Sequence, residues 1–139
     1  PAPNPWFWLH NESADDPSLQ GVCGSPAKGL IPFVDETGIF SNSCLQLGWK
    51  AQSANFPDGD PMGSSDPYGG GYRHCVSTCH LIRRYGPIGK LLRYAWDAIQ
   101  EDRNDQNSIT DMQGEDFGEV QSIDCRSCED ACLDRYPLR

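Results

Sequence analysis

Apolar residues in the second half of the chain recur at the spacing of a helix. Between residues 88 and 99 they follow one another at intervals of three and four, which predicts an amphipathic helix that runs to about Glu101. The stretch 72–85 shows the same period. Because only Gly86 separates the two stretches, we expect two antiparallel helices that pack against each other.

The facing surfaces of these two helices are expected to form the core. The residues that we expect to be buried between them are Val76, Ile82, Ile88, Leu92 and Trp96. Two further helices are predicted. Thr110 with Gln113 three residues later resembles a capping box that starts a third helix, and Asp124 could cap a fourth helix that runs to about Arg135.

Residues 1–71 differ in kind from residues 72–139. They contain nine of the 11 prolines and ten of the 14 glycines, which interrupt helices. We expect an irregular arm with a short helix over 41–51 and a loop over 56–71, docked on the helical part through the aromatic residues 6–8. The predicted fold class is therefore mainly α: a disulfide-stapled bundle of about four helices with a Pro/Gly-rich N-terminal half, in one compact domain.

Four cysteines form two pairs with helical spacing. Cys75 and Cys79 are four residues apart, and so are Cys128 and Cys132. Residues at this spacing share one face of a helix. Two antiparallel helices can therefore be joined by the disulfides Cys75–Cys132 and Cys79–Cys128.

The total of seven cysteines favours an oxidising compartment and leaves one thiol over. We expect Cys23 to pair with Cys44 and Cys125 to remain free. The alternative is a zinc site built from Cys125, Cys128 and Cys132 with a histidine. The helical character of this segment favours disulfides instead.

Charge argues against one class of partner. The chain has 20 acidic and 11 basic residues, a net charge of -9. Nucleic-acid binding needs Lys and Arg on the phosphates, so we expect no nucleic-acid partner. The carboxylates Asp58, Asp60 and Asp66 look in part like a calcium loop, but the closing Glu is missing.

His74 is the first candidate for catalysis. It follows Arg73 and three glycines, so we expect it in the first turn of its helix. A helix N-terminus favours a neutral imidazole and attracts anions. His74 could then act as acid and base, with Arg73 as a clamp for an anionic group. The alternative is a packed histidine with a satisfied hydrogen bond; His80 is a secondary candidate.

Carboxylates that could complete this site lie on the next two predicted helices. Glu101 or Asp111 is expected to orient the imidazole, with Asp97 and Glu115 as secondary candidates. Paired carboxylates can also bind a divalent metal ion. The sequence requires no cofactor but leaves a divalent metal possible. The alternative is a solvated helix face.

The order of these motifs over about residues 66–136 resembles the toxin domains at the C-termini of RHS-repeat and other polymorphic toxin proteins of bacteria. That family has Arg-His-Cys on one helix, Glu at the end of the next, and Asp-x2-Asn-Asn-x2-Gly opening a third. The matching residues are Arg73, His74, Cys75, Glu101, Asp111 and Gly118. Gly114 and Glu115 stand where the family has two asparagines.

This resemblance implies an antibacterial effector: a secreted toxin tip delivered to the envelope or periplasm of a rival cell and neutralised by a cognate immunity protein. A larger parent protein would lie upstream of Pro1. Disulfides and the acidic surface favour a cell-envelope substrate, such as a phospholipid, a lipid-linked precursor or peptidoglycan, hydrolysed at His74. The alternatives are a non-enzymatic secreted disulfide-rich binding module or inhibitor, and an immunity or adaptor protein, which the cysteines disfavour.

Overall fold

The computed structural model describes residues 43–59 and 66–138, and these ranges contain helices and no strand. In order, the elements are α3 (Ser43–Asn55), the π-helical turn η2 (Pro67–Gly71), α4 (Tyr72–Tyr85), α5 (Pro87–Gln100), α6 (Gln106–Gln121), α7 (Cys128–Ala131) and the 3-10 turn η3 (Cys132–Asp134). The predicted fold class is confirmed. The aromatic residues 6–8, which we expected to dock on the bundle, lie outside the described ranges.

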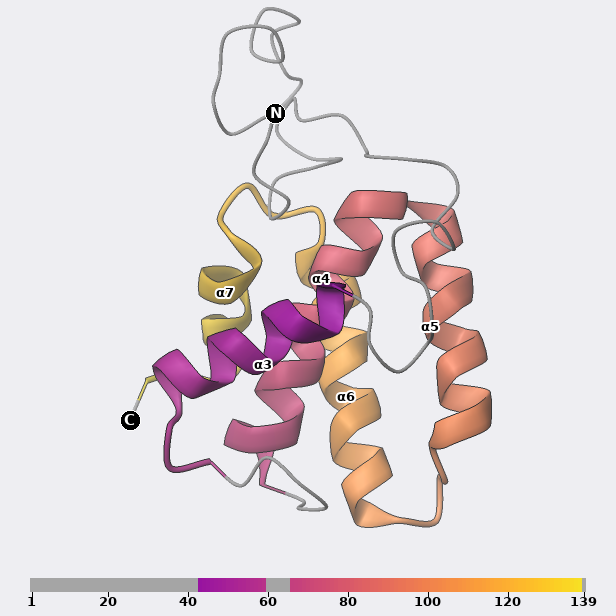
Figure 1. Cartoon of the computed structure of the whole chain (residues 1–139), viewed down its shortest axis with the longest axis horizontal. Coiled ribbons are helices and arrows are strands. Elements are labelled where there is room, and N and C mark those ends of the chain that lie inside the picture. Colours follow the sequence, from indigo (N-terminus) through magenta and orange to yellow (C-terminus); the bar gives the residue numbers. More distant parts are fainter. Residues whose placement is uncertain (1–42, 60–65, 139) are drawn as a thin grey trace, which may run out of the picture.

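Helix α4 lies at the centre of the described fold. Helices α3, α5 and α6 and the C-terminal segment all pack against it (Figure 1). All of its residues except His74 and Leu81 are buried, including Val76 and Ile82 as predicted. A side chain on α4 is therefore positioned by several neighbouring elements at once.

The helical segment that carries His74 begins earlier than the sequence predicts. Asp66 accepts a hydrogen bond from the backbone N–H of Tyr68 at 3.0 Å, and Pro67 occupies the first turn. Because Gly71 has helical backbone angles, η2 runs directly into α4. The prediction of a loop up to Gly71 is therefore wrong for residues 67–71. His74 does lie in the first turn of α4, as predicted, but the helical turn η2 precedes it. The glycines of η2 are buried, so packing outweighs their low helix propensity.

Helix α5 packs less deeply than we expected. Ile88, Leu92 and Trp96 are only partly buried, while Leu91 and Ile99 are 67% and 62% exposed. The helix lies on the outside of the bundle (Figure 1). Polar side chains, chiefly Arg93, connect α5 to α6. The predicted apolar core between α4 and α5 is therefore only partly correct: its α4 residues are buried, but its α5 residues are only partly buried.

Two helix starts also differ from the predictions. Helix α6 begins with Asp105, which accepts a hydrogen bond from the N–H of Ser108 at 3.2 Å, so it starts before Thr110. Ser127, not Asp124, caps α7. In both places another residue with a short side chain that accepts hydrogen bonds caps the helix N-terminus. Helix α3 extends four residues beyond the predicted end at residue 51.

Two disulfides join α4 to the C-terminal segment in the predicted pairing, Cys75–Cys132 and Cys79–Cys128. Since Cys128 and Cys132 are both oxidised, the alternative zinc site is excluded. The staple spans 57 and 49 residues of sequence, which makes it a strong constraint on the unfolded chain.

The remaining cysteines do not follow the prediction. Cys125 is disulfide-bonded rather than free. Cys44 is a buried thiol on α3, which corrects the predicted Cys23–Cys44 bond; Cys23 itself lies outside the described residues. A thiol buried in a core packs as a small apolar side chain, whereas Cys125 lies in an exposed loop where a second cysteine can reach it.

The hydroxyl of Tyr72 connects three elements in the core. Its ring packs edge-on against Phe56 and Tyr136, with centroids 4.8 and 6.2 Å away. The hydroxyl accepts from the amide of Asn55 at 2.8 Å and donates to the carbonyl of Glu129 at 2.9 Å. Burial raises the pKa of Tyr72 to about 12, so the phenol stays protonated and keeps donating.

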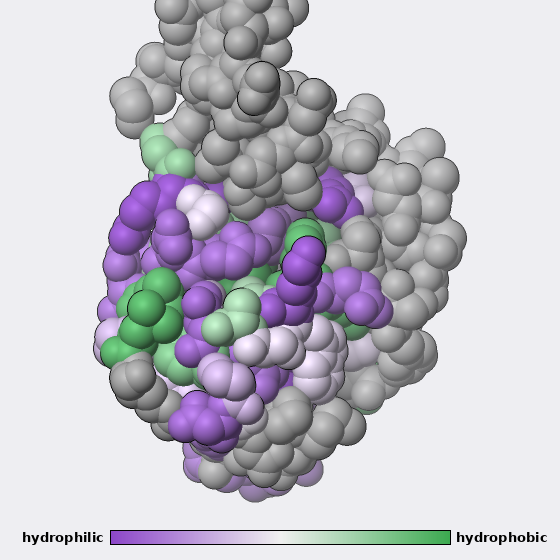
Figure 2. All heavy atoms as spheres, turned by 60° about the vertical axis from the view of Figure 1, so that its left-hand side comes forward, coloured by the Kyte–Doolittle hydropathy of each residue, from purple (hydrophilic) through white to green (hydrophobic). Residues whose placement is uncertain are grey.

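The surface of the described residues is largely polar, as expected for a chain with a net charge of -9. On the face shown in Figure 2, hydrophilic side chains dominate the described residues, and apolar ones form small separate patches. Of the helices in the described ranges, none combines the length with the apolar character that a bilayer span requires.

The substitution Tyr72→Phe should lower the free energy of unfolding by about 1–3 kcal/mol, because it leaves the partly buried partners Asn55 and Glu129 without the hydroxyl. Tyr94→Phe is the matched control, since Tyr94 is 50% exposed, and should change the free energy by less than about 0.5 kcal/mol. Urea denaturation of the oxidised protein measures both. Equal effects of the two exchanges would contradict the role assigned to Tyr72.

Candidate active site around His74

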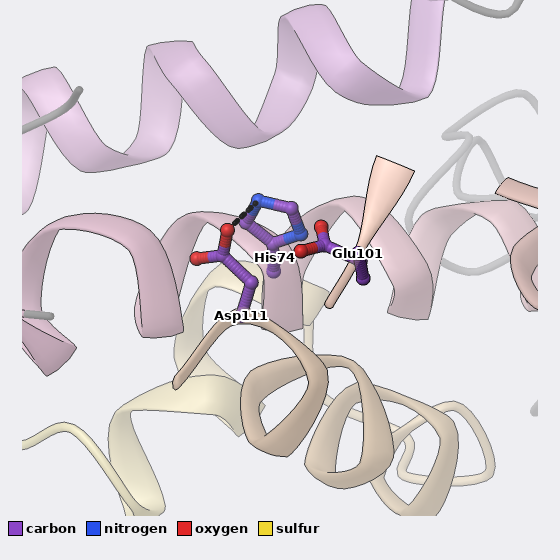
Figure 3. A group of neighbouring side chains, drawn as sticks. All are labelled: His74, Glu101 and Asp111. Atoms are coloured by element: carbon purple, nitrogen blue, oxygen red, sulfur yellow. Dashed lines mark ion pairs between the residues drawn. The ribbon is translucent and has the colours of Figure 1, made fainter. Parts of the chain in front are cut away.

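His74 lies between two carboxylates of α6. Its Nδ1 is 2.6 Å from Oε2 of Glu115, and its Nε2 is 3.3 Å from Oδ2 of Asp111. The imidazole is 11% exposed. Figure 3 shows that Glu101, at the end of α5, also points toward the imidazole. The structure therefore brings together residues of three elements that the sequence singled out.

The close approach of α6 to α4 places these carboxylates on His74. A Cβ atom at Gly114 would collide with the carbonyl oxygen of Gly71, and one at Gly118 with that of Cys75. Glu115 follows Gly114 and is buried. The departure from the asparagine pair of the toxin pattern thus falls where the two helix backbones meet.

Arg93 is the site residue that sequence reasoning missed. Its guanidinium is 6% exposed and donates to Asp97 and Glu115 at 3.3 Å each and to Asp116 at 2.5 Å. Arg93 therefore neutralises the carboxylate that contacts His74. The i,i+4 spacing of Arg93 and Asp97 was the available signal, but it is common on solvated helices.

Arg73 contacts His74 but is largely engaged elsewhere. One guanidinium nitrogen is 3.4 Å from Nε2 of His74, and another donates to Gln52 at 3.4 Å. The group also stacks over the ring of Trp49, 4.3 Å from its centroid. Burial lowers the pKa of Arg73, with Asp111 and Glu101 opposing. The predicted clamp is at the site, held between α4 and α3.

Burial shifts the ionisation of the whole cluster. Burial, followed by the proximity of Glu115, raises the pKa of Asp97 to about 8. Burial raises the pKa of Glu115 to about 7, although Asp97 and Arg93 oppose it. Asp97 and Glu115 therefore share a proton that Asp97 holds more tightly. Burial also raises the pKa of Asp111 and lowers that of His74, which favours a neutral imidazole.

His80, the other histidine on α4, is not part of this cluster. Its Nε2 is 2.7 Å from Oε1 of Glu129 on α7, and the residue is 1% exposed. The bond links α4 to the C-terminal segment. His80 is therefore a packed histidine whose Nε2 is paired and whose buried Nδ1 has no hydrogen-bond partner among the described residues, and it lies away from the site.

Two overlapping groups have ligand atoms close enough to hold a metal ion. They are His74, Glu101 and Asp111, and Asp97, Glu101 and Glu115; within each group the ligand atoms lie within 4.8 Å of one another. Glu101 belongs to both. Asp97 and Glu101 also line a cavity of about 760 Å³ between α5 and α6. The cluster therefore adjoins a space that a substrate can enter.

Replacing Gly118 by Ala should push α6 away from α4, because the added methyl group meets the Cys75 carbonyl. We expect a loss of about 1–3 kcal/mol in unfolding free energy, with lower activity since Glu115 leaves His74. Gln113→Ala on the exposed side of α6 should change stability by less than about 0.5 kcal/mol. Denaturation curves test this, and an unchanged Gly118→Ala would refute the close contact.

Comparisons with known proteins give this cluster no precedent. No family model, no curated protein and no solved structure matches the chain. The resemblance to toxin domains of RHS-repeat proteins therefore stays a prediction based on short motifs. The geometry and charge of the His74 cluster are the basis for inferring a function.

Proposed function

We propose that this domain is a hydrolase with His74 as its central reacting group. The observation that carries the proposal is the 2.6 Å contact between Nδ1 and Glu115. We assign the imidazole proton to Nδ1, because Glu115 is the nearer carboxylate and an Arg73 nitrogen, a donor, lies 3.4 Å from Nε2. The lone pair of Nε2 then faces the site. A neutral imidazole oriented by a carboxylate is the arrangement that activates water or another nucleophile.

The reaction that fits this group is hydrolysis of an ester or phosphoester. The lone pair on Nε2 takes a proton from water. The water oxygen then bonds to the acyl carbon or phosphorus, while the bond to the leaving oxygen breaks. The proton returns to that leaving oxygen. Asp97 holds a proton near neutral pH and lies on the wall of the adjoining cavity, where a proton donor is useful.

The biological setting that we propose is interbacterial killing. The domain would be the toxic tip of a larger secreted effector, acting in the envelope of a target cell and blocked by an immunity protein. The two long-range disulfides support an oxidising compartment such as the periplasm. The net charge of -9 disfavours nucleic acid, which leaves a phospholipid or a lipid-linked precursor as the preferred substrate class.

Exporting the domain to the periplasm of a bacterium should kill the cell, and His74→Gln should raise survival by roughly 100-fold or more, the usual contribution of a positioned acid or base. His80→Gln is the matched control: it makes the same exchange on the same helix and keeps a donor for Glu129. We expect it to kill like the wild type. Colony counts after induction, together with melting temperatures, measure the outcome.

Expression of the same variants in the cytoplasm identifies the compartment. We expect no killing there, because the disulfides that join α4 to the C-terminal segment do not form in the reducing cytoplasm. Full killing by periplasmic His74→Gln would remove His74 from the reaction. A wild type that is harmless in both compartments would contradict the toxin proposal and favour the non-enzymatic binding module.

A further inference from the structure

We propose that His74, Glu101 and Asp111 bind a divalent cation and that Nε2 of His74 acts through it. The three side chains come from α4, from the end of α5 and from α6; Asp111 lies beside Nε2, and the Glu101 carboxylate lies near the other side of the ring (Figure 3). Their ligand atoms lie within 4.8 Å of one another. In zinc sites, N and O ligand atoms typically lie about 2.0–2.2 Å from the ion. Rotation of the two carboxylate side chains would bring their oxygens to that distance from a shared ion.

The ligand types select the class of cation. One imidazole nitrogen with two carboxylate oxygens suits Zn²⁺ or Mn²⁺, whereas Ca²⁺ and Mg²⁺ prefer oxygen ligands alone. Three protein ligands leave positions open for water and substrate, as in catalytic rather than structural sites. No cysteine thiol belongs to the group.

The hydrogen bond from His74 to Glu115 supports this assignment. Metal-bound histidines commonly donate their second N–H to a carboxylate, which fixes the ring and makes the ligating nitrogen more basic. Here Nδ1 donates to Glu115 at 2.6 Å, and Arg93 in turn donates to Glu115 at 3.3 Å. Nε2 is thereby presented as the ligating nitrogen.

Glu101 is the ligand candidate whose carboxylate the described residues leave without a side-chain hydrogen bond. It points toward the imidazole (Figure 3). Arg93 already pairs with Asp97 and Glu115, whereas no side chain of the described residues donates to Glu101. A divalent cation held by Glu101 and Asp111 would offset these carboxylates and let an anionic substrate approach.

The second metal-ligand group, Asp97 with Glu101 and Glu115, is less suitable. Arg93 already lies 3.3 Å from both Asp97 and Glu115. Its positively charged guanidinium therefore occupies the place between these two carboxyl groups that a metal ion would need. Arg73 is different. Its guanidinium lies 3.4 Å from Nε2 of His74 and also contacts Gln52 and Trp49. If a metal ion took the place of the guanidinium beside His74, the contacts of Arg73 with Gln52 and Trp49 could remain.

A catalytic role of the cation rests on the proposed hydrolase function. Binding of the cation to the three residues does not depend on that proposal. When bound, a divalent cation supplies Lewis-acid activation of a water molecule or of a substrate oxygen. His74 and Asp111 would then hold the cation, so Nε2 would serve as its ligand in place of taking a proton from water directly, and Glu115 would keep the imidazole in the ligating tautomer. The cavity between α5 and α6 lies on the Glu101 side, where the substrate has access.

The test is a titration of the oxidised, chelator-treated full chain with Mn²⁺. We expect one Mn²⁺ per chain, a melting temperature that rises with Mn²⁺ concentration, and spin-echo spectra of the bound ion that show coupling to an imidazole nitrogen. Asp111→Asn and Glu101→Gln should each weaken binding by about tenfold or more. Asp130→Asn, the same exchange at an exposed residue of α7, should bind like the wild type.

Absence of Mn²⁺ binding by the wild type, or bound Mn²⁺ without nitrogen coupling, would overturn the cation site even if a variant fails to fold. Failure of the hydrolase proposal looks different: Mn²⁺ binds at His74, but the exported wild type does not harm the cell. Loss of killing in His74→Gln together with no Mn²⁺ binding would leave the hydrolase in place without the cation.

Discussion

The contact between the backbones of α4 and α6 is the constraint on which the candidate site depends. Gly114 and Gly118 allow α6 to reach carbonyl oxygens of the η2–α4 segment, and one of these oxygens belongs to Cys75, the residue after His74. The side chain of Cys75 is bonded to Cys132. The segment of α4 that carries His74 is therefore fixed on one side by α6 and on the other by the C-terminal disulfide.

This clamping explains how so many ionisable groups can share a small, nearly buried space. Isolated buried charges are costly, so they persist only when they are paired or change protonation. Arg93 pairs with Glu115 and Asp97, and those two carboxyls share a proton. Several groups with shifted pKa values thus gather beside a cavity, an arrangement that favours a functional origin.

The sequence predicted the parts of the fold that follow from local spacing. The two Cys-x3-Cys units specified the disulfides of α4, and helical periodicity specified α4 and α5. Burial of Trp96 was overestimated because α5 meets α6 through Arg93, a tertiary contact that periodicity does not record. Composition also concealed η2, since glycines that disfavour a helix in isolation are stabilised there by packing.

For the site, the sequence identified the participants but not their arrangement. His74, Arg73, Glu101 and Asp111 were all expected, and they do come together. The partner of Nδ1 is Glu115, which had been secondary, because the position of a side chain relative to another helix depends on how closely the backbones pack. The same limitation concealed Arg93, and it concealed the helical turn η2 that precedes the first turn of α4, where His74 lies.

The central claim is that Glu115 fixes His74 as a neutral imidazole with its proton on Nδ1 and its lone pair on Nε2. Long-range ¹H–¹⁵N NMR correlation of the imidazole, recorded slightly above neutral pH without added metal, measures this directly. The account predicts a protonated Nδ1 and an unprotonated Nε2 for His74, and loss of this fixed tautomer in Glu115→Gln. A proton on Nε2, or an imidazolium with both nitrogens protonated, would contradict it.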